Sequence, residues 1–102
     1  MNNKGEPENN FFRVSHKVFD DEKFKQLNNS AKVLYFTLCK LRNRFADENG
    51  VFFRSDRTLV KDSGLGLSSI WRARHELLQN NFIKWKQGKS HIACLYQIND
   101  LN

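Results

Sequence analysis

The sequence has few cysteines that could cross-link the chain, a single proline that could interrupt a helix, and no long apolar run that could anchor it in a membrane. Its two cysteines, Cys39 and Cys94, show no CxxC or CxxH spacing, so we expect two small buried apolar side chains rather than a disulfide. The only proline is Pro7, and no apolar run approaches the roughly 18 residues that a membrane span needs. The polar first ten residues do not form a signal peptide. We therefore expect a soluble protein of a reducing cytoplasm.

The sequence also lacks the residue patterns of an enzyme. Its nearest approach to a glycine-rich phosphate loop is the fragment GLG at 64–66. The three histidines, at 16, 75 and 91, have no neighbours at the spacing of metal ligands, and no Ser, His and acid arrangement stands out. We expect no catalysis, no metal site, no cofactor and no small-molecule ligand.

Acidic residues are outnumbered by basic ones, with 11 Asp and Glu against 17 Lys and Arg, which gives a net charge of +6 over 102 residues. This length suits one small domain, and nine Phe, two Trp and two Tyr supply enough apolar surface for its core. The positive charge favours an anionic partner such as nucleic acid. A basic protein that is merely soluble is the alternative interpretation.

The pattern along the chain predicts an α+β fold that is mainly α. Residues 1–10 are expected to be a disordered tail, because their composition cannot bury enough apolar surface, and 11–102 to form the domain. The expected elements are a strand or extended arm at 11–14, a short helix at 20–26, a helix from 31 to about 44 after the N-cap Ser30, a strand at 51–54, helices at 56–63 and from 67–69 to 80–81, and strands at 82–86 and 91–98.

The helix at 31–44 is expected to be the central packing element. Its apolar residues recur at spacings of three and four, as one buried face requires. This stripe consists of Ala31, Leu34, Tyr35, Leu38, Leu41 and Phe45. Val33 and Phe36 lie off the stripe, which indicates that the helix is covered on two sides.

Residues 56–86 form the most informative segment, DRTLVKDSGLGLSSIWRARHELLQNNFIKWK. Ser55 is a good N-cap for the first of two short helices, and Gly64 ends that helix where a left-handed residue fits. A strand-like run and a basic hairpin follow. Many proteins use such a pair of helices with a hairpin to place the second helix in the major groove of DNA.

The second helix of this pair is expected to have one apolar and one polar face. At 100° per residue, Ile70, Ala73, Leu77 and Leu78 fall on one side. The expected base-contacting residues on and beside the opposite face are Ser68, Ser69, Arg72, His75 and Gln79. Arg72 lies near the centre of that face, and an arginine can bind guanine through two hydrogen bonds. An ordinary solvated helix face is the alternative.

The expected contacts to the DNA backbone come from both helices and from the hairpin. They are Arg57, Lys61, Trp71, Arg74, Lys84, Lys86, Lys89 and Ser90. Some of them have alternatives: Trp71 could be a partly buried edge of the core, and Arg74 could pair with an acidic residue. Hairpin lysines such as Lys84 could also protect an exposed sheet edge from pairing. Ile83 and Trp85 take the alternate strand positions and should face the core.

The same residues resemble a known family. Leu59, Gly64, Leu65, Ile70 and Ala73 fall where bacterial winged helix-turn-helix domains have their apolar positions and turn glycine. The wider pattern, FFRVSHKVFDDEKFKQLNNSAKVLYFTL followed by DENGVFF, resembles the N-terminal winged-helix domain of RepA-type plasmid replication initiators, with DnaD-like and phage replication proteins similar in this part. Such initiators carry a further C-terminal domain, so the resemblance implies either one domain of an initiator or a small regulator.

The resemblance implies a protein of a bacterial plasmid, phage or other mobile element, associated with the plasmid or nucleoid, that binds double-stranded DNA. We expect a homodimer, because one such module buries little area, with Phe11 and Phe12 as candidate contacts. Replication initiation and transcriptional repression both fit. A winged helix that docks on a protein of the replication machinery is a third alternative, and RNA binding is less favoured because no aromatic stacking platform is evident.

Overall fold

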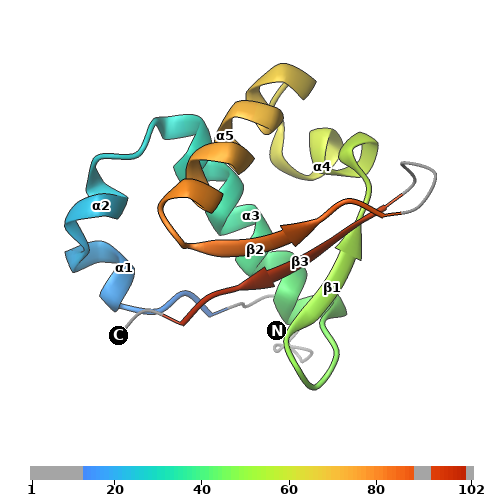
Figure 1. Ribbon diagram of the computed structural model, residues 1–102, viewed down its shortest axis with the longest axis horizontal. Coiled ribbons are helices and arrows are strands. Elements are labelled where there is room, and N and C mark those ends of the chain that lie inside the picture. The colour runs from blue at the N-terminus through green and yellow to red at the C-terminus, as the bar shows by residue number, and fades with distance from the viewer. Residues whose placement is uncertain (1–12, 89–92, 101–102) are drawn as a thin grey trace, which may run out of the picture.

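A three-stranded antiparallel sheet and five helices surround one apolar core in the computed structural model, which describes residues 13–88 and 93–100 (Figure 1). The elements are α1 (Lys17–Asp20), α2 (Glu22–Lys25), α3 (Asn29–Phe45), β1 (Val51–Arg54), α4 (Asp56–Ser63), α5 (Leu67–Gln79), β2 (Ile83–Lys86) and β3 (Cys94–Ile98). The expected tail at 1–10 and the pair Phe11–Phe12 lie outside the described residues.

The sheet has the strand order β1-β3-β2, so the run at 51–54 is an edge strand as predicted. Phe52 of β1 and Trp85 of β2 both lie opposite Tyr96 of β3. The Phe52 and Tyr96 rings stack with centroids 5.7 Å apart, and both side chains are almost fully buried. These three aromatic residues lie on the face of the sheet that packs against the helices.

α3 is the central helix and contacts α4, α5 and two strands of the sheet. Most of the predicted stripe is buried, and Phe36 packs against the core from its side. Phe45 is the exception, because it is 52% exposed and lies beneath the guanidinium groups of Arg44 and Arg54, 5.9 and 5.0 Å from the ring centroid. The prediction that Phe45 belongs to the core is therefore wrong.

The predicted N-cap of α3 is also wrong, because the helix begins at Asn29 and its N-cap is Asn28 rather than Ser30. Asn28 is fixed from outside its own helix. Its backbone N–H and side-chain amide both donate to the carboxylate of Glu76 on α5, at 2.9 and 3.0 Å. This tertiary contact holds the chain in place where the helix starts.

The N-terminal region contains two short helices where one was predicted, and Arg13 and Val14 belong to no strand. Asp21 breaks the helix, with an extended backbone of ψ 121°, and its carboxylate accepts a hydrogen bond from the N–H of Phe24 at 2.9 Å. It therefore ends α1 and caps α2. Aspartate is a favoured N-cap residue, and here that preference outweighs continued helix.

The α4–α5 pair forms as predicted. The Ser55 side chain accepts from the N–H of Thr58 at 3.2 Å, and Gly64 ends α4 with φ 78° in the left-handed region. A residue with a Cβ would be strained in that conformation. Figure 1 shows α4 and α5 above the sheet with α3 passing behind it. The three helices α3, α4 and α5 with the β2–β3 hairpin make this fold a winged helix.

Candidate nucleic-acid interface

The outer face of α5 is polar and free of internal bonds. Ser68, Arg72, His75 and Gln79 are exposed as predicted, and Ser69 is half-buried at the side. To other described residues, these side chains make no hydrogen bond or ion pair. The opposite face supplies Ile70, Ala73 and Leu77 to the core, with Leu78 partly buried. The predicted two-faced helix is therefore confirmed.

This outer face is grooved. The side chains of Trp71, Arg72, His75, Glu76 and Gln79 line an open depression of about 510 Å³. All five belong to α5, so the depression runs along the surface of one helix and is not a cavity between elements. Its open form suits a ligand that lies against the helix. The polar groups of Arg72, His75 and Gln79 are not used by other described residues there, whereas Trp71 and Glu76 are bonded to Asp56 and Asn28.

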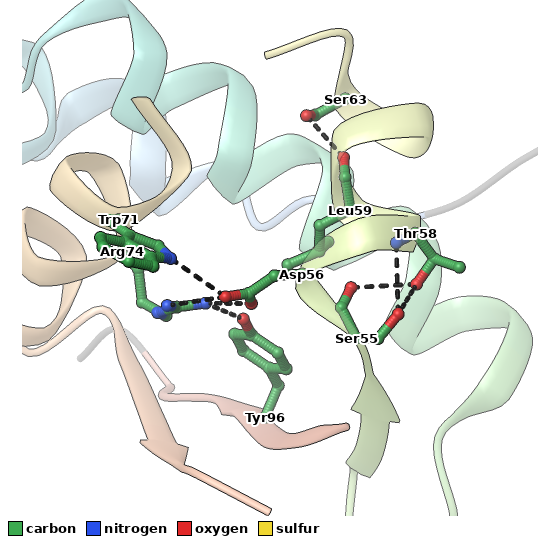
Figure 2. Close-up of polar contacts among 8 residues, drawn as sticks. All are labelled: Ser55, Asp56, Thr58, Leu59, Ser63, Trp71, Arg74 and Tyr96. Atoms are coloured by element: carbon green, nitrogen blue, oxygen red, sulfur yellow. Dashed lines mark hydrogen bonds and ion pairs between the residues drawn. The ribbon is translucent and has the colours of Figure 1, made fainter. Parts of the chain in front are cut away.

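Arg74, two residues after Arg72, lies on the inner side of the helix (Figure 2). Only 7% of it is exposed, and its Nη1 donates to Asp56 Oδ1 at 2.7 Å and to the Tyr96 hydroxyl at 2.9 Å. Its guanidinium also lies over the Trp85 ring, 4.6 Å from the centroid. The predicted role of Arg74 as a phosphate contact is therefore corrected, and its alternative, an acidic partner, is confirmed.

The cluster of Arg74, Asp56 and Tyr96 is electrostatically balanced. Burial alone would raise the pKa of the Asp56 carboxyl, but hydrogen bonds from Arg74 and Trp71 and the charge of Arg74 outweigh it and lower that pKa. Burial raises the pKa of Tyr96 to about 12 although Arg74 opposes this shift. At neutral pH the cluster therefore contains one cation, one anion and a neutral phenol.

Trp71 sits at the edge of the same cluster and reaches outward from it. Its indole Nε1 donates to Asp56 Oδ2 at 3.1 Å, while 56% of the residue remains exposed. The prediction of a partly buried core edge is wrong, since Trp71 is neither in the core nor packed on it. Its predicted contact with the DNA backbone stays a prediction.

Glu76 makes a structural contact that the sequence did not indicate. Its two hydrogen bonds from Asn28 tie α5 to the start of α3, across 48 positions of the chain. With the Arg74–Asp56 ion pair to α4, they hold α5 from both sides. No local sequence pattern indicates the Asn28–Glu76 contact or the Asp56–Arg74 ion pair, because the two residues of each pair lie far apart in the sequence.

The described basic residues of the predicted backbone-contacting set, other than Arg74, are exposed. Arg57 and Lys61 are on α4, and Lys84 and Lys86 alternate along β2 with buried Ile83 and half-buried Trp85. The predicted orientation of the strand is thus confirmed. Lys89 and Ser90 lie outside the described residues.

The cysteines, the acidic residues and histidines, and the helices bear on the other kinds of site considered for this sequence. Cys39 and Cys94 are buried free thiols, as predicted. Within residues 13–88 and 93–100, no three His, Cys, Asp or Glu side chains gather where they could hold a metal ion. In the same residues, every helix is too short or too polar to cross a bilayer.

Solved structures show the same fold. One named "N-Terminal domain of DNA binding protein" matches with a TM-score of 0.68 and 21% identity, over 100% of this chain and 87% of that one. Another, "Structure of Rep-DNA complex", matches with a TM-score of 0.67 and 20% identity, over 90% and 77%. No family model and no curated protein sequence matches the chain. At these identities the likeness establishes the fold: this chain is a winged helix similar to those of a DNA-binding protein and a Rep protein.

Proposed function

We propose that this protein binds double-stranded DNA, with α5 in the major groove and the β2–β3 hairpin along the phosphate backbone. The observation that carries the proposal is the outer face of α5, where donors and acceptors remain unused while both flanks of the helix are fixed to α3 and α4. A rigid helix with free hydrogen-bonding groups is what base recognition requires. The name "Structure of Rep-DNA complex" of one similar structure supports DNA as the ligand.

Five residues of α5 are the proposed base readers. Arg72 offers a bidentate fork to guanine, and Gln79 can bond the edge of adenine in the same way. Ser68, Ser69 and His75 lie between or beside them and can reach bases or phosphates. The exposed positions of Ser68, Arg72, His75 and Gln79 fit this assignment, and Ser69 is half-buried beside them.

Phosphate contacts are assigned to basic residues of α4 and of the hairpin that follows α5, and those that the structure describes are exposed. They are Arg57 and Lys61 on α4 and Lys84, Lys86 and Lys89 on the hairpin, with Ser90 and the indole of Trp71 as neutral contacts. Five neutralised phosphates imply a slope of log K against log salt of about −4 to −5. A salt response close to flat would contradict this mode.

We further propose that the protein acts in replication initiation or transcriptional control on a plasmid, phage or other mobile element, as a homodimer. The support is the resemblance to replication initiators and the limited area that one module can bury. Iterated binding sites would favour the replication role, and one palindrome over a promoter would favour repression. A monomer, free and on DNA, in size-exclusion chromatography would remove the dimer from the proposal.

The test is selection of bound sequences from random duplex DNA at near-physiological salt. We expect an enriched motif, and the spacing of its half-sites would report the oligomer. Arg44→Ala is the matched control for Arg72→Ala, because Arg44 is an exposed arginine of α3. It should recover the same motif as the unaltered protein. Weak binding that ignores sequence and survives the loss of Arg72 would instead support a winged helix that docks on a replication protein.

A further inference from the structure

α5 exposes two large apolar side chains beside its polar face. Leu67 is 47% exposed and Trp71 is 56% exposed. Trp71 is four positions after Leu67, so the two side chains lie on the same side of the helix, one turn apart. Together they form an apolar edge, which we call the Leu67–Trp71 pair.

The core does not account for this pair. Ile70, Ala73 and Leu77 already anchor α5 to the domain. Two other exposed aromatic residues have partners on the surface: Phe45 lies under two guanidinium groups, and Phe19 stacks on Phe36 with ring centroids 6.2 Å apart. Phe53 is also exposed, but it lies on β1 and not on α5. The Leu67–Trp71 pair therefore presents apolar surface outward on the helix proposed to enter DNA.

The orientation of Trp71 is fixed. Its indole N–H donates to Asp56, and that carboxylate is held in turn by Arg74, so the ring does not swing freely (Figure 2). A side chain that is already ordered loses little entropy when it binds a ligand. The Asp56 contact therefore prepares the exposed ring for a partner.

The pair lies next to the polar readers. Ser68 and Arg72 each follow one member of the pair, about 100° farther round the helix. Trp71 lines the depression along α5 together with Arg72, His75, Glu76 and Gln79. A ligand in this depression therefore meets an apolar wall and hydrogen-bonding groups side by side.

In the major groove, this combination matches one feature of the bases. Thymine presents a 5-methyl group there beside an acceptor oxygen, and apolar side chains recognise that methyl. We propose that the Leu67–Trp71 pair contacts thymine 5-methyl groups and so selects A·T pairs at defined positions; for Trp71 this base contact takes the place of the backbone contact named above, because its indole N–H is already donated to Asp56. This inference rests on the proposed binding of duplex DNA by α5.

Replacing thymine by uracil tests it on the unaltered protein. The probe is the duplex recovered by selection, synthesised with deoxyuridine in place of each thymidine in turn, which removes only the methyl group. We expect the dissociation constant, measured by fluorescence anisotropy, to rise about fourfold at one or two positions, the loss of one buried carbon. Equal affinity for the thymine and uracil versions at every position would overturn the inference.

Variants then assign the methyl contact to the pair. We expect Leu67→Ala or Trp71→Ala to abolish the uracil effect at one position, with folding checked by circular dichroism. Phe53→Ala is the matched control, because Phe53 is 60% exposed on β1, away from α5, and it should leave the effect intact. An effect that persists in both α5 variants would refute the assignment. Failure of the unaltered protein to bind any duplex would refute the proposed function itself, whereas binding without methyl dependence refutes this inference alone.

Discussion

Arg72 and Arg74 show how differently the two faces of α5 use the same side chain. Arg72 is exposed and has no bonding partner among the described residues, whereas Arg74 is buried against Asp56, Tyr96 and the Trp85 ring. One is available to a ligand and the other is consumed by the fold. Position on the helix, and not residue type, therefore decides which positive charges can meet DNA.

The same distinction applies to the net charge of +6. Arg54 donates to Asp62 at 2.8 and 3.0 Å, and Arg74 pairs with Asp56, so two arginines are matched by carboxylates within the domain. The exposed lysines of β2 and the basic residues of α4 remain for an external anion. The charge that bears on DNA binding is therefore that of the exposed basic residues of α4 and β2, and not the net charge of the whole chain.

The largest expected effect comes from breaking the inner side. Arg74→Met keeps much of the apolar stem but leaves the Tyr96 hydroxyl without its donor and the Asp56 carboxylate with only the Trp71 indole as a partner among the described residues. Removing one partner of a buried ion pair typically costs about 3–5 kcal/mol, and we expect the free energy of unfolding to fall by that order in urea titrations. Arg72→Met is the matched control and should change it by less than about 0.5 kcal/mol. Equal losses of unfolding free energy in Arg74→Met and Arg72→Met would contradict the view that only Arg74 is used by the fold.

A second prediction concerns the acid partner of Arg74. Asp56→Asn removes the charge that two donors share, and we expect a loss of about 1.5–3 kcal/mol at neutral pH. The folded pKa of Asp56 lies below that of the unfolded chain, so the stabilisation is complete above about pH 4 and is lost as the pH falls through the folded value. The gap between the two proteins in urea titrations should therefore close in acid.

The control for that experiment is Asp20→Asn, because Asp20 is an exposed carboxylate on α1. We expect it to change the free energy of unfolding by less than about 0.5 kcal/mol at neutral pH. A gap between the unaltered protein and Asp56→Asn that stayed constant from pH 7 down to pH 2 would show that the charge of Asp56 has no part in the stabilisation.

The third prediction addresses the outer face. If Arg72 reads a guanine, Arg72→Ala should weaken binding of the selected duplex by about 1–3 kcal/mol and relax the preference at one base pair. The free energy of unfolding should stay nearly unchanged, which separates this effect from that of Arg74→Met. Equal losses of affinity on every sequence would make Arg72 a phosphate contact.

Local patterns were sufficient to predict α5 and the turn before it. The apolar residues of α5 repeat with the helical period, and Gly64 marks a left-handed turn that needs no distant partner. The outer face then follows from geometry alone. The alternation of β2 likewise predicted which of its side chains face the core.

Contacts between residues that are distant in the sequence could not be predicted from local patterns. Arg74 projects near the apolar side, and its partners Asp56 and Tyr96 lie 18 and 22 positions away. Phe45 continues the stripe of α3 beyond the point where other elements cover it. In each case the outcome depends on which elements meet in space, and helical periodicity carries no information about that.

The smallest predicted effect tests the second anchor of α5. Glu76→Gln keeps the shape of the side chain but weakens its two hydrogen bonds from Asn28 and removes a negative charge from the N-terminus of α3, where the helix dipole favours it. We expect a loss of about 1 kcal/mol in the free energy of unfolding. Asn28→Ala removes one of the same bonds and should add little once Glu76 is changed, so a double-mutant cycle with additive losses would contradict the anchor. Because one of the two polar contacts that fix α5 beside its apolar core would then be weakened, we also expect Glu76→Gln to lower sequence preference more than total DNA affinity.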